Sequence, residues 1–228
     1  MFKAVITAGG LGTRLLPATK EIPKELLPLY ARGVNGEVLL KPVIQVIFEL
    51  LYDAGVREFC FVTGRGKRAI EDHFTPDWKF IEYLERVGKE VQARELSRFS
   101  RMVEDSTIVW VRQPQPLGFG HAVYMAKPFV GGDKFILAAG DTVVYPGDFI
   151  RELMAKAGGS DAVLAVRSVD NPRIYGVVVL ESSKVVRVVE KPREPPSNLA
   201  ILPFYVLPPE IMGEIARLKP GVGGEIQL

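Results

Sequence analysis

Cysteine, histidine and asparagine are scarce in this chain of 228 residues, which has one cysteine, two histidines and three asparagines. A single cysteine excludes an internal disulfide framework and fits a reducing compartment, so we expect a cytoplasmic protein. Cys60 lies within the apolar run of residues 59–62, which indicates a buried structural thiol rather than a catalytic one. The sequence also shows no evident Ser/His/Asp or Cys/His arrangement for nucleophilic catalysis.

Long hydrophobic runs and a strong net charge are absent as well. No stretch approaches the length of a membrane-spanning helix, and the apolar run that begins at Ala4 stops at Gly9, too early for a signal peptide. A net charge of +2 is too small for a surface that coats nucleic acid. We therefore expect neither a membrane nor a nucleic acid as a partner. The small number of asparagines and the 17 prolines favour a thermophilic source.

Short apolar, β-branched runs alternate with helical patterns, which predicts βαβ units around a mostly parallel sheet. A helix with a broad buried face is expected over residues 42–54, and surface helices over residues 77–104. After about residue 170 the pattern predicts a strand pair, a further strand and a helix over residues 209–218. Residues 32–36 and 192–197 are expected to be loops. The clearest strand candidates are residues 4–8, 58–63, 107–111, 134–138, 162–166, 175–180, 185–189 and 199–206.

Residues 8–14 form a glycine-rich segment, AGGLGTR, directly after the first predicted strand. The segment does not match the P-loop pattern, because no Gly-Lys-Ser/Thr follows it. It does not match the dinucleotide-binding pattern either, because Leu15 occupies the position of the third glycine. What remains is a glycine loop that ends in a cation. Its free N–H groups can approach a polyphosphate, and Arg14 can bind phosphate oxygens through its planar fork. The alternative is a tight turn with a surface arginine.

The next residues favour a binding loop, because Pro17, Pro23 and Pro28 interrupt any helix over residues 9–29. Such a long, irregular stretch is a poor connector between elements. Lys20 and Lys24 add cations near the glycines. We interpret Lys20 as a solvated surface charge and Lys24 as functional.

Three further positions stand at strand ends. Asp141 follows a buried strand at its carboxyl end, where open α/β sheets place ligands. Glu190 and Lys191 follow a valine-rich run and indicate the edge of a site, with a surface ion pair as the alternative. Gln113 is either a binding amide or a polar residue that ends a strand. His121 near a helix start is interpreted as a packing or capping residue and receives no catalytic role.

The opening AGGLGTRLLPATKEIPKELLPL, residues 8–29, closely resembles the bacterial-type UTP–glucose-1-phosphate uridylyltransferases of the sugar nucleotidylyltransferase superfamily. An ordered set of motifs extends the resemblance over the whole chain, at residues 112–113, 117–122, 140–141, 175–177, 190–192, 197–200 and 224–228. The resemblance implies an α/β, Rossmann-like fold of three layers, α/β/α, with a mostly parallel mixed sheet. It also implies that residues 1–228 form a single catalytic domain.

The resemblance implies a reaction in which UTP and glucose 1-phosphate give UDP-glucose and pyrophosphate with Mg²⁺ as the cofactor. An amide side chain suits uracil, because that base edge alternates acceptors with one donor. The roles implied are uracil binding by Ala8, Gly9, Gln113 and Gly118, nucleotide binding by the loop residues Gly10, Gly12 and Thr13, triphosphate binding by Arg14 and Lys24, Mg²⁺ binding by Asp141, sugar binding by Gly176 and Glu190, and binding of the sugar phosphate by Lys191. Arg14, Lys24 and Lys191 would be the catalytic residues.

Two departures from the family pattern stand out. Related chains run on past residue 228 into helices that carry a second metal-binding aspartate and much of the oligomer contact, and residues 31–40 are an insertion. A homo-oligomer is left open. Rival functions are an enzyme that uses dTTP or several sugar phosphates, and a truncated, inactive nucleotide-binding or regulatory protein. An NAD-dependent oxidoreductase fits poorly, given the failed glycine spacing.

Overall fold

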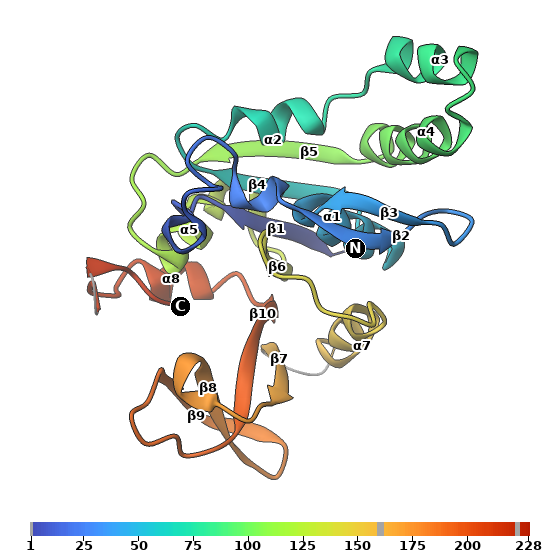
Figure 1. Ribbon diagram of the computed structural model, residues 1–228. Coiled ribbons are helices and arrows are strands. Elements are labelled where there is room, and N and C mark those ends of the chain that lie inside the picture. The colour runs from blue at the N-terminus through green and yellow to red at the C-terminus, as the bar shows by residue number, and fades with distance from the viewer. Residues whose placement is uncertain (1, 159–161, 222–223) are drawn as a thin grey trace.

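The computed structural model describes residues 2–158, 162–221 and 224–228. In this part of the chain, eight strands form one sheet in the order β5-β4-β1-β6-β10-β8-β9, with β7 paired to β10 (Figure 1). The strands of this sheet are β1 (Lys3–Ala8), β4 (Glu58–Thr63), β5 (Thr107–Arg112), β6 (Phe135–Ala139), β7 (Val163–Ser168), β8 (Gly176–Glu181), β9 (Lys184–Glu190) and β10 (Leu199–Leu207).

Strands β5, β4, β1 and β6 run parallel to one another and form the centre of the molecule. Their near-continuous apolar sequences suit this position, because a parallel sheet is covered on both faces. Strand β10 joins them antiparallel to β6 through residues 204–207. Strand β10 also pairs with β7 between residues 199 and 206 and with β8 at Ala200. These strands and β9 lie below the parallel strands in Figure 1.

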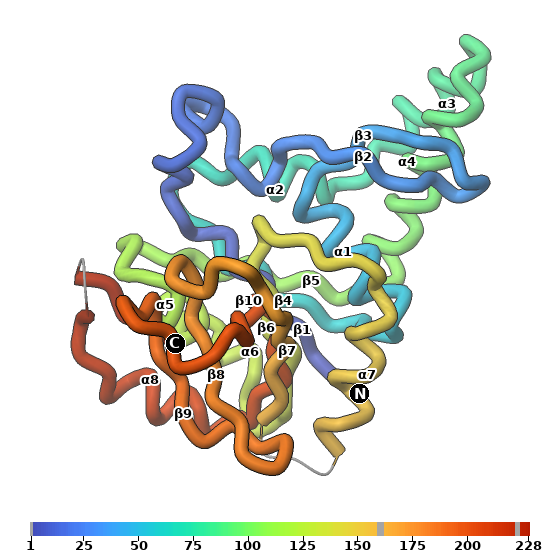
Figure 2. Tube along the Cα trace, turned by 60° about the horizontal axis from the view of Figure 1, so that its bottom comes forward, coloured from blue at the N-terminus to red at the C-terminus, as the bar shows by residue number. Residues whose placement is uncertain are grey.

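Helices and 3-10 turns connect the strands. The helices are α1 (Val43–Asp53), α2 (Arg68–His73), α3 (Trp78–Arg86), α4 (Glu90–Glu104), α5 (Phe119–Met125), α6 (Lys127–Val130), α7 (Phe149–Lys156) and α8 (Ile211–Ile215), and the 3-10 turns are η1 (Thr13–Leu15), η2 (Lys24–Leu26) and η3 (Pro172–Ile174). Figures 1 and 2 show α3 projecting from the body of the molecule. No helix in the described ranges is long and apolar enough to cross a membrane.

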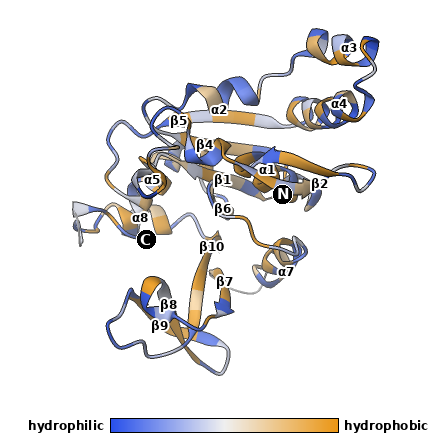
Figure 3. Ribbon diagram, in the orientation of Figure 1, coloured by the Kyte–Doolittle hydropathy of each residue, from blue (hydrophilic) through white to orange (hydrophobic). Residues whose placement is uncertain are grey.

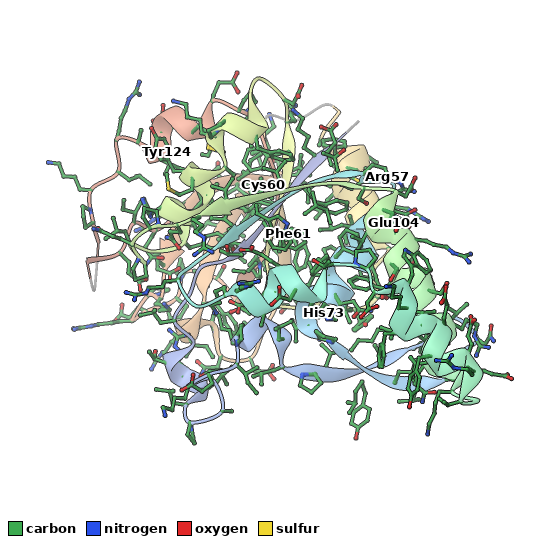
Figure 4. All side chains as sticks on the ribbon, turned by 90° about the horizontal axis from the view of Figure 1, so that it is seen from above. Arg57, Cys60, Phe61, His73, Glu104 and Tyr124 are labelled. Atoms are coloured by element: carbon green, nitrogen blue, oxygen red, sulfur yellow. The ribbon has the colours of Figure 1, made fainter. Side chains whose placement is uncertain are left out.

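Two hydrophobic clusters cover opposite faces of the sheet, because successive side chains of a strand alternate between the faces. Ile6 and Phe61 belong to the cluster that contains residues of α1, α2, α4 and α7. Val5 and Cys60 belong to the cluster formed with α5, α6 and α8. In Figure 4 the labelled His73 and Tyr124 lie on opposite sides of the sheet. The strands carry much of the hydrophobic colour in Figure 3. Helices on both faces of one sheet confirm the predicted three-layer α/β/α fold.

A two-stranded hairpin, β2 (Pro28–Arg32) and β3 (Val38–Pro42), was not predicted as strands. Only its turn was expected, as the loop over residues 32–36. The hairpin is held by Lys41, which is 4% exposed and forms ion pairs with Glu49 and Glu95 at 2.9 and 3.2 Å. The predicted C-terminal helix over residues 209–218 is shorter in the structure, at Ile211–Ile215.

Candidate functional site

The carboxyl ends of the four parallel strands place four loops side by side. Ala8 is in register with Thr63, Thr63 with Arg112, and Thr7 with Ala139. The residues that follow these strands therefore meet at one edge of the sheet, as expected for open α/β folds. A cleft of about 590 Å³ lies there, lined by Thr7, Gly9, Gly10, Leu11, Gly12, Thr13, Arg14, Leu15, Lys24, Glu25, Gln113, Pro116, Gly118, Phe119, Ala122, Ala139, Asp141 and Glu225.

Glycines allow these loops to pack closely. A Cβ atom on Gly64 would lie 2.9 Å from the carbonyl oxygen of Gly9, so the loops after β4 and β1 touch through their backbones. A Cβ atom on Gly10 would lie 3.1 Å from Nζ of Lys24. Gly12 has a φ of 70°, which glycine adopts without strain. The glycines therefore leave backbone exposed along the cleft instead of side chains.

Lys24 and Asp141 face each other across the cleft. Their Nζ and Oδ2 atoms are 2.5 Å apart, and Oδ1 of Asp141 accepts a hydrogen bond from the Thr142 hydroxyl at 3.2 Å. The two side chains are 22% and 35% exposed, so a ligand that enters the cleft can reach both. The lysine offers a charge to an anion, and the carboxylate offers an oxygen ligand to a hard cation. Within the described ranges, no three or more His, Cys, Asp or Glu side chains form a group that could hold a metal ion.

Arg14 lies in η1 on the wall of the same cleft and is exposed. Its guanidinium forms no ion pair or hydrogen bond with any described residue of the chain. The fork is therefore free to bind an anion in the cleft. Figure 2 shows the loop that carries it, between β1 and β2, standing away from the sheet.

Gln113 directly follows β5 and is only 5% exposed. Its backbone N–H donates to the Thr63 carbonyl at 2.8 Å. Its side-chain Nε2 donates to the Gly118 carbonyl at 3.1 Å and lies 3.1 Å from Nδ1 of His121. Both amide hydrogens are thus directed towards the turn that starts α5.

The segment 225–227 completes this end of the cleft. The Ile226 N–H donates to the Leu117 carbonyl at 2.7 Å, and the Gly120 N–H donates to the Ile226 carbonyl at 2.9 Å. Gly118 has a φ of 104°, and a Cβ atom on it would lie 2.7 Å from the Ile226 carbonyl oxygen. Only glycine fits this position, so the motifs at residues 117–122 and 224–228 form one structural unit.

Sequence reasoning missed Glu25 and Lys67, which form a buried ion pair at the wall of the cleft. Glu25 is fully buried, and its carboxylate lies 2.7 Å from Nζ of Lys67. Burial raises the pKa of Glu25 above its ordinary value, while the hydrogen bond from Lys67 opposes that shift. The second carboxylate oxygen, Oε1, has no hydrogen-bond partner among the described residues. No local signal could identify this pair, because the two residues are far apart in the sequence.

Gly176, Glu190 and Lys191 form a separate cluster on β8 and β9. Gly176 pairs with Glu190, and a Cβ atom on Gly176 would lie 2.9 Å from a Glu190 carboxylate oxygen. The ammonium group of Lys191 lies 2.9 Å from the same carboxylate, and both side chains are half-exposed. Burial, with a smaller effect of Glu190, raises the pKa of Tyr205 to about 12. The structure brings the predicted sugar residues together, but none of them lines the cleft that Arg14 and Asp141 share.

A family model described as nucleotidyl transferase matches residues 3–225. The matched range includes all the residues that line the cleft. The chain belongs to the nucleotidyl transferase family. It is 39% identical over 239 residues to the UTP–glucose-1-phosphate uridylyltransferase of Bacillus subtilis, with 99% of this chain and 77% of that protein covered. It is 41% identical over 239 residues to the protein of the same name from Staphylococcus epidermidis, covering 99% of this chain and 78% of the other.

Solved structures of nucleotidyl transferases share the fold. A UDP-glucose pyrophosphorylase in complex with UDP-glucose superposes with a TM-score of 0.80 at 31% identity, covering 100% of this chain and 84% of the other. The UTP-bound enzyme from Acinetobacter baumannii gives a TM-score of 0.80 at 32% identity, covering 95% of this chain and 78% of the other. These likenesses confirm the predicted α/β nucleotidyltransferase fold.

Proposed function

We propose that this chain transfers a uridylyl group from UTP to glucose 1-phosphate and releases UDP-glucose and pyrophosphate. The observation that carries the proposal is the cleft at the carboxyl edge of the sheet. One wall is a glycine-rich loop that ends in Arg14, which pairs with none of the described residues, and the facing residues are Lys24 and Asp141. The chain that forms this cleft is also 39% identical to the Bacillus subtilis protein named UTP–glucose-1-phosphate uridylyltransferase.

The nucleotide is expected to occupy the cleft between the glycine loop and Gln113. Backbone atoms of Ala8 and Gly9, with Gln113 and Gly118, would bind uracil. The exposed backbone of Gly10, Gly12 and Thr13 would approach the phosphates, because N–H groups in such a loop are free to donate. Arg14 and Lys24 would bind the triphosphate and offset the charge that develops on the leaving pyrophosphate.

Mg²⁺ is the cofactor we propose for this cleft, with Asp141 as its protein ligand. The residues fit such an ion, because Mg²⁺ is commonly bound by one or two carboxylates together with substrate phosphates and water. When bound, the ion would neutralise phosphate charge and hold the oxygens in position. Lys24, which occupies one oxygen of Asp141 in this structure, would then be free to bind phosphate.

The sugar phosphate is expected to approach from the β8–β9 side, where Gly176 and Glu190 would contact the sugar and Lys191 its phosphate. An oxygen of that phosphate forms a bond to the α-phosphorus of UTP, and the bond to pyrophosphate breaks in line with it. The attacking oxygen is already ionised, so no general base is required. The main obstacle is repulsion between two anions, which Lys191 on one side and Arg14 with Lys24 on the other reduce.

Cys60 supports a cytoplasmic location for this reaction. It is the only cysteine of the sequence, and it is fully buried, as predicted. Burial also raises the pKa of its thiol to about 12, so the reactive thiolate is strongly disfavoured. The fold therefore depends on no disulfide and carries no exposed thiol.

Steady-state kinetics of pyrophosphate release test the proposal. Asp141→Asn keeps the shape of the side chain but removes its charge, and we expect turnover to fall by about 10² to 10³-fold. Arg14→Lys should impair catalysis because it loses the bidentate fork, and Arg14→Ala should cost more. The matched control is Lys20→Ala in the same loop, whose side chain is 78% exposed and, among the described residues, pairs only with Glu21. Wild-type kinetics in Arg14→Ala, or near-normal turnover of Asp141→Asn at limiting Mg²⁺, would contradict the assignments.

A further inference from the structure

The orientation of the Gln113 side-chain amide is determined by its neighbours. The Gly118 carbonyl can only accept a hydrogen bond, so the group 3.1 Å from it must be the NH₂ group of Gln113. The reversed amide would place two oxygens against each other. The second hydrogen of the same NH₂ group is directed at Nδ1 of His121, also at 3.1 Å.

This contact specifies the state of His121. A ring nitrogen that faces an NH₂ group can bind it only as an unprotonated acceptor, so Nδ1 must carry no proton and Nε2 must carry one. The position of His121 is fixed, because the preceding Gly120 donates its backbone N–H to Ile226 at 2.9 Å. His121 is half-buried in α5, and its neighbour Ala122 lines the cleft.

With both hydrogens engaged, the carbonyl oxygen of Gln113 is the atom left for a ligand. This Oε1 points at the glycine loop, since a Cβ atom on Gly9 would lie only 2.0 Å from it. No donor from the described residues reaches this oxygen. The amide therefore presents an acceptor to the part of the cleft where Gly9 and Gly118 also lie.

We propose that His121 is a positioning residue that, together with the Gly118 carbonyl, holds the Gln113 amide with its acceptor towards the base and so sets the choice of nucleobase. An acceptor at this point suits uracil, whose N3 carries a hydrogen, and it disfavours cytosine, whose N3 is itself an acceptor. Two facing acceptors leave a polar group unpaired, which is the strongest way for a site to reject a similar ligand. This inference rests on the proposed function of the same cleft.

The test compares kcat/KM for UTP and CTP, with glucose 1-phosphate and Mg²⁺ present. His121→Leu removes one of the two acceptors that hold the NH₂ group and leaves only the Gly118 carbonyl. The reversed amide then becomes easier to adopt, and the UTP/CTP ratio should fall by about tenfold, as expected for one lost hydrogen bond in a buried site. His121→Asn offers an amide oxygen near the place of Nδ1 and should restore most of the ratio. Tyr124→Leu is the matched control, because Tyr124 also lies in α5 but packs in the cluster around Val123 and should leave the ratio unchanged.

The outcomes separate this inference from the function on which it rests. If the wild-type chain makes no pyrophosphate from UTP and glucose 1-phosphate, the proposed function fails. If it does so selectively but His121→Leu keeps the UTP/CTP ratio, or Tyr124→Leu lowers it equally, the role of His121 is refuted. Nitrogen-15 NMR of the unsubstituted protein gives a second test that needs no variant. A proton on Nε2 of neutral His121 supports the role, and a proton on Nδ1 overturns it.

Discussion

Replacing Gly9 by alanine should displace Gln113 and disrupt the nucleotide cleft. The added Cβ atom would lie 2.0 Å from Oε1 of Gln113, closer than non-bonded atoms approach, and 3.1 Å from Cδ, which is a tight contact. The glutamine cannot yield without cost, because its NH₂ group is directed at Gly118 and His121 at 3.1 Å each. The substitution therefore acts on a contact that both the fold and the proposed uracil site use.

The magnitude follows from the contacts that must break. Each hydrogen bond contributes about 1 kcal/mol net, so moving the amide should lower the free energy of unfolding by about 2 kcal/mol. Losing the oriented amide should also lower kcat/KM for UTP by about tenfold, the equivalent of one hydrogen bond to a buried group. The change should fall mainly on UTP and scarcely on glucose 1-phosphate.

A double-mutant cycle gives the clearest assay. Urea denaturation and pyrophosphate-release kinetics would be measured for Gly9→Ala, Gln113→Ala and the double variant. In the Gln113→Ala background the clash is gone, so Gly9→Ala should add little further loss. Gly132→Ala is the matched control, because a Cβ atom at Gly132 meets nothing within 4 Å. Equal effects of Gly9→Ala with and without Gln113 would refute the reasoning.

Three other predictions concern groups around the core and the sugar site. Burial lowers the pKa of His73 below 6.5, so the folded state should lose stability as the pH falls below that value, and His73→Phe should flatten this dependence in denaturation curves. Lys67→Met leaves Glu25 buried without its partner and should cost about 3 kcal/mol at pH 8. The cost should shrink as the pH falls, because burial raises the pKa of Glu25 and favours its neutral form. Lys191→Ala should weaken use of glucose 1-phosphate while UTP affinity, followed by isothermal titration, stays unchanged. A collapse of UTP affinity instead would place Lys191 with the triphosphate.

The parallel centre of the fold could be predicted because its strands are short apolar runs between helical patterns. The hairpin β2–β3 could not, because its strands carry apolar side chains on the solvent face. Tyr30, Val38 and Leu40 are 77%, 68% and 61% exposed. Apolar residues in this segment therefore do not mark a buried face, and the sequence pattern did not predict two strands. What anchors the hairpin is the buried charge of Lys41, which pairs with residues of two later helices.

The residues of the site that follow strand ends could be predicted, and those that depend on side-chain contacts between loops and helices could not. Arg14, Lys24, Gln113 and Asp141 lie in one cleft because parallel strands end at one edge of the sheet. The contact between His121 and Gln113 depends on side-chain orientations that no spacing rule contains. The roles of Gly176, Glu190 and Lys191 stay predictions, as does the single catalytic domain over residues 1–228.

Phosphorus NMR of the wild-type chain with UTP, glucose 1-phosphate and Mg²⁺ tests the central claim most directly. Our account predicts that UDP-glucose and pyrophosphate appear together in equal amounts, and only when both substrates are present. Release of orthophosphate from UTP would contradict the account, because it would indicate hydrolysis in place of uridylyl transfer. Binding of UTP with no product would also contradict it and would indicate an inactive nucleotide-binding protein.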